Sequence, residues 1–487
     1  MSALSEYLSE LVESRNINLN QLSKMTGISR ATLHHYVHGK RQILKRQHLD
    51  IIIDALQISP NQKEKLDEAY QIECIGEHLF YQRKHVKEFF SSLENIRGAG
   101  PDKKKIEADI SIEDNPCQFS RTILTKEELI NTAFQIFLRA YITGQDIWIY
   151  MDPRSEILRE TLLSPVFSGY SSSVIHVFRL FSGSSSKREE SLNNFSIIDR
   201  LFKYSTQITN YIPLYFYETN QDAETMYPLT EFIVTDDCVL QLATGGDFAI
   251  LLTEKDAGSL YKKIFERMCD RSRRFGGNFT EIFEIVHSYE KAFSDSERMG
   301  ENLIYTFSGD ICINEFWTPD TVKRYVKKNT PKEKELMNEI IDYSRNYKKI
   351  IGKGRHVSIL VKQYLEAFIR TGVLNRLPEE YMADAFSVED RKNIVNQMVR
   401  RVREDDNSYV LVDRKEFPIR HGWEGFAQKD MVALQNTNEE GSYFFPVYER
   451  SFSYAIYDFL ESLSGEKGSL KGEDAVKLIT EWKNAYL

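Results

Sequence analysis

The stretch NINLNQLSKMTGISRATLHHYVHGKR, residues Asn16 to Arg41, has the pattern of two short helices joined by a tight turn. Gly27 stands at the turn, where glycine accommodates the positive φ that other residues avoid. Ser29 is placed to N-cap the second helix, because its side-chain oxygen can accept a hydrogen bond from an orphan backbone N–H of the first turn. These features predict that this stretch decides the fold of the N-terminal region.

The side chains of the two predicted helices divide into two faces. The apolar residues are spaced to face a common small core: Leu22, Ile28, Leu33 and Tyr36. The opposite face carries Arg30, Ala31, His34, His35 and His38. This arrangement predicts a helix-turn-helix, in which the second helix enters the DNA major groove.

The charge of the same region favours a nucleic-acid partner. From Ser14 to His48 the sequence has no Asp or Glu. The cations of this window are Arg15, Lys24, Arg30, Lys40, Arg41, Lys45 and Arg46, and its histidines are His34, His35, His38 and His48. A positive stripe attracts the phosphate backbone and makes binding salt-dependent. A solvated basic hairpin is the alternative, but turn, cap, core spacing and charge all coincide.

About the first 60 residues resemble the repressor-type helix-turn-helix family that contains the lambda and 434 repressors. The matching residues are Leu22-Ser23, Gly27-Ile28-Ser29-Arg30, Thr32-Leu33 and Gly39-Lys40-Arg41. Two positions depart from the family pattern. Leu19 stands where a phosphate-binding Gln often opens the first motif helix, and Val37 replaces a frequent acidic residue.

The resemblance implies a set of DNA contacts. Base contacts are expected from Arg30, Ala31, His34 and His35, and phosphate contacts from Asn18, Asn20, Thr32, Lys40 and Arg41. Arginine is the commonest bidentate reader of guanine, whereas alanine offers only an apolar contact, for example to a thymine methyl. Because histidine has a reference pKa of about 6.5, binding can strengthen below neutral pH.

The composition is that of a globular protein. The chain has 487 residues, of which 41% are hydrophobic and 28% charged, so two to four domains are expected. No apolar run approaches the roughly 18 residues of a membrane-spanning helix, and the acidic, amphipathic N-terminus is no signal peptide. The net charge of -9 does not oppose DNA binding, because a DNA-binding face is local.

The cysteines give no sign of a metal site. The five are Cys74, Cys117, Cys238, Cys269 and Cys312, and none has zinc-site spacing. They indicate reduced, mostly buried thiols in a cytoplasmic protein. No metal ion and no cofactor are expected.

The pattern along the chain predicts a multidomain protein, with an all-α helix-turn-helix domain followed by a large α/β region. The expected parts are the DNA-binding domain 1–60, a helical connector 61–97 with dimerisation as a second role, a linker 98–115, an α/β half 116–322, a basic helical connector 323–355 and a second α/β half 356–487. The first half is expected to have a helix from Thr125 to Ile142 and another from about Ala257 to Phe275. Its expected strands are 147–151, 174–181, 211–217, 231–236, 238–243 and 247–252.

The second half repeats part of the first. The segment 426–435 aligns with 232–241, which indicates an internal duplication. A duplicated strand-Asp-strand-strand-helix unit resembles the phospholipase D-like fold, whose active halves carry His-x-Lys, four intervening residues and Asp. Asp236 and Asp430 take the Asp place. The His and Lys places hold Leu229 and Glu231 in the first copy, and Trp423 and Gly425 in the second, so the resemblance implies a fold without its catalytic motifs.

No other catalytic constellation is evident. Asp152 follows a predicted buried strand and can lie in a crevice at strand ends, although a turn or cap role is more common for such a residue. We therefore expect a non-enzymatic, sequence-specific transcription regulator of a bacterial type. It would bind double-stranded DNA as a homodimer, and its C-terminal region would sense a small-molecule or peptide effector or mediate assembly, without membrane association. The alternatives are a DNA-targeted nuclease or phosphodiesterase and a defence-system interaction protein.

Overall fold

A computed structural model represents the protein. It describes residues 2–40, 45–93, 117–167, 172–181, 188–208, 210–218, 230–243, 247–279, 287–289, 291–292, 294, 303–330, 332–351, 356–374, 385–438, 441–466 and 468–487. The chain divides into two compact units, Met1–His85 and Val86–Leu487. Arg41 and the predicted linker 98–115 lie outside the described residues.

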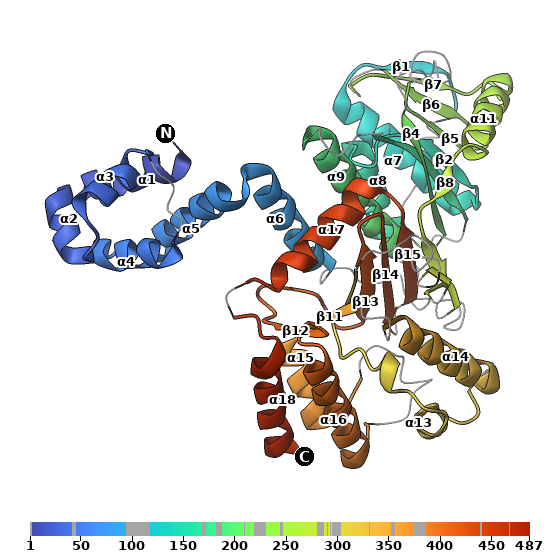
Figure 1. Ribbon diagram of the computed structural model, residues 1–487. Helices are drawn as coiled ribbons and strands as arrows, with labels where there is room; N and C mark the ends of the chain where they lie inside the picture. The colour runs from blue at the N-terminus through green and yellow to red at the C-terminus, as the bar shows by residue number, and fades with distance from the viewer. Residues whose placement is uncertain are drawn as a thin grey trace. The chain divides into compact units, whose positions relative to one another are not determined.

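The first unit is helical (Figure 1). Its helices are α1 (Ala3–Ser14), α2 (Leu19–Thr26), α3 (Arg30–Val37), α4 (Arg46–Leu56) and α5 (Pro60–Ile75). One apolar cluster joins all five, and Leu66 and Ala69 of α5 belong to it. Helix α5, expected in the connector, therefore completes the core of this unit.

Helix α6 (Glu77–Ser92) crosses the boundary between the units. Val86, Phe89, Phe90 and Leu93 are buried in the main core of the second unit. The Phe89 ring packs edge-on against Phe202, with 5.1 Å between ring centroids. The predicted connector 61–97 is thus helical, but its two ends belong to different cores, and its dimerisation role stays a prediction.

The second unit contains two mixed sheets. The strands of the first sheet are β1 (Arg121–Ile123), β2 (Ile147–Tyr150), β3 (Val174–Phe181), β4 (Tyr211–Glu218), β5 (Phe232–Val234), β6 (Val239–Leu242), β7 (Ala249–Leu252) and β8 (Arg273–Arg274). Their order is β1-β7-β6-β5-β2-β3-β4-β8. Strands β2, β3 and β4 are parallel, and the β2–β5, β5–β6, β6–β7, β1–β7 and β4–β8 pairs are antiparallel.

The second sheet has the order β12-β11-β10-β13-β14-β15-β9. Its strands are β9 (Gly277–Phe279), β10 (Ile304–Ser308), β11 (His356–Val361), β12 (Tyr409–Val412), β13 (Trp423–Gln428), β14 (Met431–Asn438) and β15 (Gly441–Val447). Strands β10, β11 and β12 are parallel, and the remaining pairs are antiparallel.

Both sheets follow one strand order. The order β1-β7-β6-β5-β2-β3-β4 in the first sheet corresponds to β9-β15-β14-β13-β10-β11-β12 in the second. In both sheets the last three of these strands are parallel, and the other neighbouring pairs are antiparallel. The second sheet includes β9 and β10, so it begins well before residue 323. The segment 323–355, expected between the halves, lies between β10 and β11 of the second sheet. The sequence patterns missed β10 and β11 because the polar residues Thr306 and Ser358 interrupt their apolar runs.

Helices accompany both sheets. Those of the first half are α7 (Lys126–Thr143), α8 (Glu156–Leu162), η2 (Pro165–Phe167), α9 (Arg188–Gln207) and α11 (Lys255–Cys269). Those of the second half are η3 (Asn314–Phe316), α13 (Pro319–Tyr325), α14 (Glu333–Ile351), α15 (Lys362–Thr371), α16 (Val388–Glu404), α17 (Arg450–Leu463) and α18 (Gly472–Tyr486). Helix α11 packs on β2, β5 and β6, and α17 packs on the corresponding strands β10, β13 and β14. Helices α9 and α17 contact one another, and their aromatic side chains join one core.

The paired segments 232–241 and 426–435 are both hairpins, but their turns differ. Four residues, Thr235 to Cys238, separate β5 from β6, whereas only Lys429 and Asp430 separate β13 from β14. Phe232 pairs with Gln241, but Phe426 pairs with Ala433. The residue-by-residue alignment therefore fails across the turn.

The prediction that all five cysteines are reduced thiols is wrong for one pair. Cys117 and Cys238 form a disulfide with 5.7 Å between their Cα atoms. Their sequence separation is 121, so no spacing pattern could have signalled the pair. Cys74, Cys269 and Cys312 take part in no disulfide.

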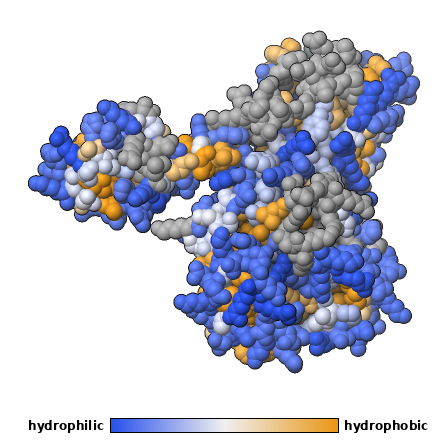
Figure 2. All heavy atoms as spheres, in the orientation of Figure 1, coloured by the Kyte–Doolittle hydropathy of each residue, from blue (hydrophilic) through white to orange (hydrophobic). Residues whose placement is uncertain are grey.

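The visible face of the molecule is predominantly hydrophilic (Figure 2). No helix in the described part of the chain is both long and apolar enough to cross a membrane.

Candidate DNA-binding surface

The α2–turn–α3 segment is held by local hydrogen bonds. Asn18 caps α2 and forms a capping box with Gln21, each side chain accepting a backbone N–H of the other residue. Gly27 adopts φ +70°, as the turn requires. Ser23 Oγ donates to the carbonyl oxygen of Ile28 at 2.6 Å, and Ser29 Oγ accepts the N–H of Thr32 at 3.2 Å. The predicted turn and cap are both present.

Helix α3 has one buried face and one exposed face. Leu33, Tyr36 and Val37 are buried, and Leu22 and Ile28 join them in the core of the first unit. The residues predicted to contact bases lie on the other side: Arg30, Ala31 and His35 are exposed, and His34 is half-buried. Arg30 and Ala31 lie in the first turn of α3. In a helix-turn-helix the N-terminal residues of the recognition helix contact base edges in the major groove.

The predicted phosphate contacts lie around the ends of α2 and α3. Asn18 is exposed at the N-terminus of α2, and Asn20 is exposed in its first turn. Helix N-termini attract phosphate because their N–H groups and macrodipole favour anions. Thr32 is half-buried and its hydroxyl lies 2.8 Å from that of Ser29, whereas Lys40 is exposed after α3.

Part of the basic window serves the fold instead. Arg15 donates to the carbonyl oxygen of Leu56 at 2.7 Å, and Arg46 forms ion pairs with Asp50 and Asp67. His48 Nδ1 lies 2.9 Å from the Tyr36 hydroxyl. The remaining described cations of the window are exposed: Lys24, Arg30, Lys40 and Lys45. Asp50 of α4 and Asp67 of α5 thus neutralise Arg46. The cations available to a phosphate backbone are therefore the four exposed ones, most of which lie on or next to α2 and α3.

Histidines gather on the exposed side of α3. The His34 and His38 rings lie 4.4 Å apart between centroids, and those of His34 and His35 lie 6.1 Å apart. Desolvation, followed by the nearby His38, Lys40, His35 and Arg30, lowers the pKa of His34. The unbound surface therefore favours the neutral form of His34.

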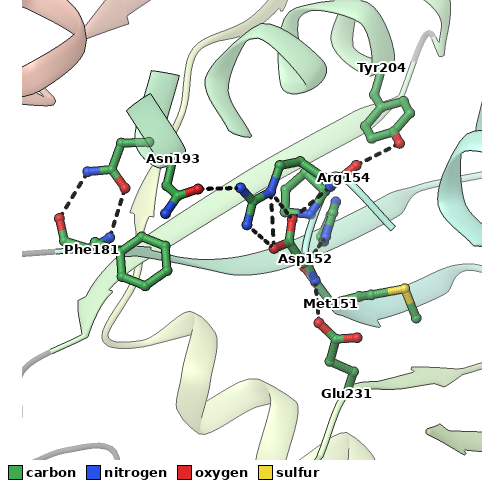
Figure 3. A network of polar contacts seen from close by, with 10 residues as sticks. Met151, Asp152, Arg154, Phe181, Asn193, Tyr204 and Glu231 are labelled. Carbon is green, nitrogen blue, oxygen red and sulfur yellow. Dashed lines mark hydrogen bonds and ion pairs between the residues drawn. The ribbon is translucent and has the colours of Figure 1, made fainter. Parts of the chain in front are cut away.

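A second polar cluster lies at the carboxyl end of β2 (Figure 3). Arg154 Nη2 donates to Asp152 Oδ2 at 2.7 Å, and its Nη1 donates to Asn193 Oδ1 at 2.9 Å. The Asp152 N–H donates to Glu231 Oε1 at 2.7 Å. Tyr204 donates from its hydroxyl to the carbonyl oxygen of Pro153 at 2.8 Å. These contacts tie β2, α9 and the start of β5 together.

The two carboxyl groups of this cluster have opposite pKa shifts. Burial opposes ionisation of Asp152, but hydrogen bonds from the Arg154 side chain and backbone outweigh it and lower the Asp152 pKa. Burial raises the pKa of Glu231, and the charge of Asp152 adds to that shift. Such a split can assign an acid and a base in an enzyme. Here the Arg154 guanidinium is committed to Asp152 and Asn193, which is the bonding of a structural clamp.

The aspartates expected at the phospholipase D-like Asp place lie in turns. Asp236 pairs with Lys262 at 2.5 Å, and Asp430 pairs with Arg450 at 3.0 Å. Glu231, at the Lys place, bonds to the Asp152 backbone, and Trp423 and Gly425 lie in β13. Leu229 is outside the described residues. Among the described residues, no group of three or more His, Cys, Asp or Glu side chains is arranged to hold a metal ion.

Comparison with known proteins identifies the N-terminal region. Residues 7–62 match the Cro/C1-type HTH DNA-binding domain, which confirms the predicted repressor-type helix-turn-helix. No curated protein matches the chain.

Two solved structures align with low TM-scores. TrmBL2, an archaeal chromatin protein whose structure shows a novel mode of DNA binding, has 11% identity and a TM-score of 0.22 over 55% of this chain and 98% of its own. Polyphosphate kinase from Porphyromonas gingivalis has 8% identity and a TM-score of 0.21 over 74% of this chain and 49% of its own. The second alignment thus spans about half of the kinase chain.

Sequence reasoning found one member of the polar cluster and missed its partners. Asp152 was singled out because it follows a buried strand. Arg154 carried no comparable signal, and Glu231 was considered only at the Lys place of the phospholipase D-like pattern. Asn193 and Glu231 come from separate segments that the fold brings to Arg154 and Asp152.

Proposed function

We propose that this protein is a sequence-specific DNA-binding transcription regulator of a bacterial, cytoplasmic type, with α3 as its recognition helix. The observation that carries the proposal is the exposed face of α3 with Arg30 in its first turn, within a Cro/C1-type domain. The caps and core hold that face in place without using its side chains. An exposed basic helix on a preorganised support is suited to the major groove.

Substitution of Arg30 tests base recognition. Arg30→Ala should cost about 1–3 kcal/mol at the cognate site and relax preference at one base pair, because a bidentate guanine contact is lost. Lys40→Ala should weaken all sequences alike and reduce the salt slope by about one. Lys63→Ala, an exposed cation on α5, is the matched control. Selection of binding sites from random duplexes would contradict the role of Arg30 if the variant kept the wild-type preference.

The active species is proposed to be a homodimer on a pseudo-palindromic site. One such domain reads few base pairs, so a second copy is needed for a useful specificity ratio. The two recognition helices would lie about 34 Å apart, one turn of DNA. Light scattering that finds a monomer, both free and on a half-site duplex, would argue against this arrangement.

The C-terminal region is proposed to be a non-catalytic sensor or assembly module with an internally duplicated, phospholipase D-like fold. The shared strand order of the two sheets supports the duplication. Neither copy has His-x-Lys at the positions that precede Asp236 and Asp430. This supports the loss of catalysis, since attack on a phosphodiester needs an activated nucleophile and charge stabilisation. A small-molecule or peptide effector would act by shifting DNA affinity. Titration of candidate effectors against the DNA complex tests that linkage.

The competing function is a DNA-targeted nuclease or phosphodiesterase, which the opposite pKa shifts of Asp152 and Glu231 favour. The purified chain is incubated with single- and double-stranded nucleic acid and a divalent metal ion. If the wild-type chain cleaves nucleic acid and the Glu231→Gln variant does not, the C-terminal region is an enzyme and the sensor proposal is refuted. Absence of turnover in both proteins would support the sensor.

A further inference from the structure

We propose that His34, His35 and His38 form a proton-dependent DNA-reading surface, so that DNA binding strengthens as the pH falls below neutrality. The inference rests on the proposed function, because it assigns a mode of regulation to the same surface. It adds that proton uptake accompanies DNA binding and that the pair His34 and His38 carries most of it.

The geometry concentrates three imidazoles on one side of one helix. His34 and His38 are separated by one helical turn, and their rings lie 4.4 Å apart between centroids. His35 and His38 are exposed, and His34 is half-buried. Within the described residues of the first unit, none of the three rings forms a hydrogen bond of the helix–turn–helix core, whereas His48 bonds to Tyr36. The three side chains are therefore available to an incoming ligand.

The charges around the cluster disfavour protonation in the free protein. Desolvation lowers the pKa of His34 most, and the neighbouring groups His38, Lys40, His35 and Arg30 lower it further. Helices α1 and α2 pack against α3, and α4 contacts it through the Tyr36–His48 hydrogen bond. The charged groups of α4 near that contact are Arg46 and Asp50, which pair with one another, and neither is among the groups that shift His34. Helix α2 contributes Lys24, while α1 contributes Glu6, Glu10 and Glu13, none of which is among the groups that shift His34. Protonation of one imidazole therefore places a charge beside other cations.

DNA reverses this balance. Phosphate oxygens and the guanine N7 and O6 atoms are hydrogen-bond acceptors, and phosphates add negative charge. A neutral imidazole has one donor and one acceptor nitrogen, whereas the imidazolium has two donors. The imidazolium can therefore donate to DNA acceptors at both ring nitrogens and carries a charge that phosphates attract, whereas the neutral ring donates at one nitrogen only. Binding must raise the proton affinity of these rings, and by linkage acidification must raise DNA affinity.

The experiment measures DNA affinity against pH at constant ionic strength. The full-length chain is titrated by fluorescence anisotropy into a labelled duplex recovered by in vitro selection and into a duplex of shuffled sequence. EDTA is present throughout, so that no transition metal ion bridges the His34–His38 pair. Each proton taken up contributes at most about tenfold in affinity per pH unit. We expect the association constant of the wild-type protein to rise at least about tenfold from pH 8.0 to pH 6.0.

The double variant His34→Gln/His38→Gln removes the titration and keeps polar side chains of similar reach. Its association constant should rise less than about threefold over the same range, since two of the three imidazoles of the cluster are removed. The matched control is His287→Gln, an exposed histidine of the second unit, which should keep the wild-type rise. A rise on both duplexes assigns the acceptors to phosphates, and a rise confined to the selected duplex assigns them to purine edges.

Two results would overturn the inference. One is a wild-type affinity that does not change between pH 8.0 and pH 6.0, and the other is an equal rise in the double variant. Either leaves DNA binding itself intact at pH 8.0, whereas failure to bind any duplex at either pH refutes the proposed function. NMR titration of the histidine ring protons, with and without the duplex, tests the same claim independently. An unchanged His34 or His38 titration on binding would also refute it.

Discussion

Acidification should destabilise the second unit through His176, a fully buried histidine of β3. His176 Nε2 lies 2.9 Å from the carbonyl oxygen of Met151, which can only accept, so this nitrogen carries the proton. Nδ1 then accepts from the Tyr211 hydroxyl at 2.5 Å. Both ring nitrogens are thus satisfied in the neutral form, and a second proton would place a buried charge on the ring and reverse the hydrogen bond with Tyr211.

The size of the effect follows from the pKa. Burial lowers the pKa of His176 from 6.5 to about 4. Because the unfolded chain binds the proton first, stability is fully present above pH 6.5 and is lost as the pH falls towards 4. Between pH 7 and pH 5 this linkage removes about 2 kcal/mol from the free energy of unfolding.

Tryptophan fluorescence isolates the relevant unit. The four tryptophans are Trp148, Trp317, Trp423 and Trp482, and all lie beyond residue 85. Denaturant unfolding of the full chain at pH 7 and pH 5 therefore reports on the second unit alone. The comparison is with His176→Gln, whose amide can donate to the Met151 carbonyl oxygen but does not titrate.

Other groups titrate in both proteins, so the variant is essential. His356, buried and beside Arg401, also has a lowered pKa and acts in the same direction. Burial raises the pKa of Glu231 and Glu315, which act in the opposite direction. The wild type should lose about 2 kcal/mol more than His176→Gln between the two pH values. Equal losses in the two proteins would refute the assignment of a neutral, buried His176.

Three further predictions concern stability. Gly27→Val should destabilise the first unit by about 1–3 kcal/mol, because a β-branched residue is strained at φ +70°, and circular dichroism of residues 1–85 would show it as a lower melting temperature. Phe90→Ala should cost about 3–5 kcal/mol by tryptophan-monitored unfolding, since the ring is fully buried among aromatic side chains; a loss below about 1 kcal/mol would contradict its place in that core. Cys117→Ser should cost about 2–5 kcal/mol under oxidising conditions and little in the presence of a reductant, because the bridge closes a long loop.

The sequence by itself determined the helix-turn-helix of the first unit and many elements of the second, whereas the place of α5 in the first core emerged only from the structure. The turn at Gly27, the cap at Ser29 and the buried positions of α3 were predicted correctly, because they depend on interactions between residues a few positions apart. The predicted strand 174–181 coincides with β3, and the predicted helix 125–142 nearly coincides with α7 (Lys126–Thr143). Strong local periodicity explains both results.

Only the tertiary structure decided which distant segments meet. Strand β10 is an interior strand of its sheet, between β11 and β13, although its sequence shows no clear alternation, and α6 enters a core that its own residues do not reveal. The Cys117–Cys238 bridge and the Asp152–Glu231 contact likewise join segments separated by many residues. Helix caps, turns and the periodicity of apolar residues depend on residues a few positions apart, so they can be predicted from a short stretch of sequence. Sheet order, side-chain burial and cross-chain polar contacts depend on the balance of packing over the whole unit, and that balance exists only in the folded protein.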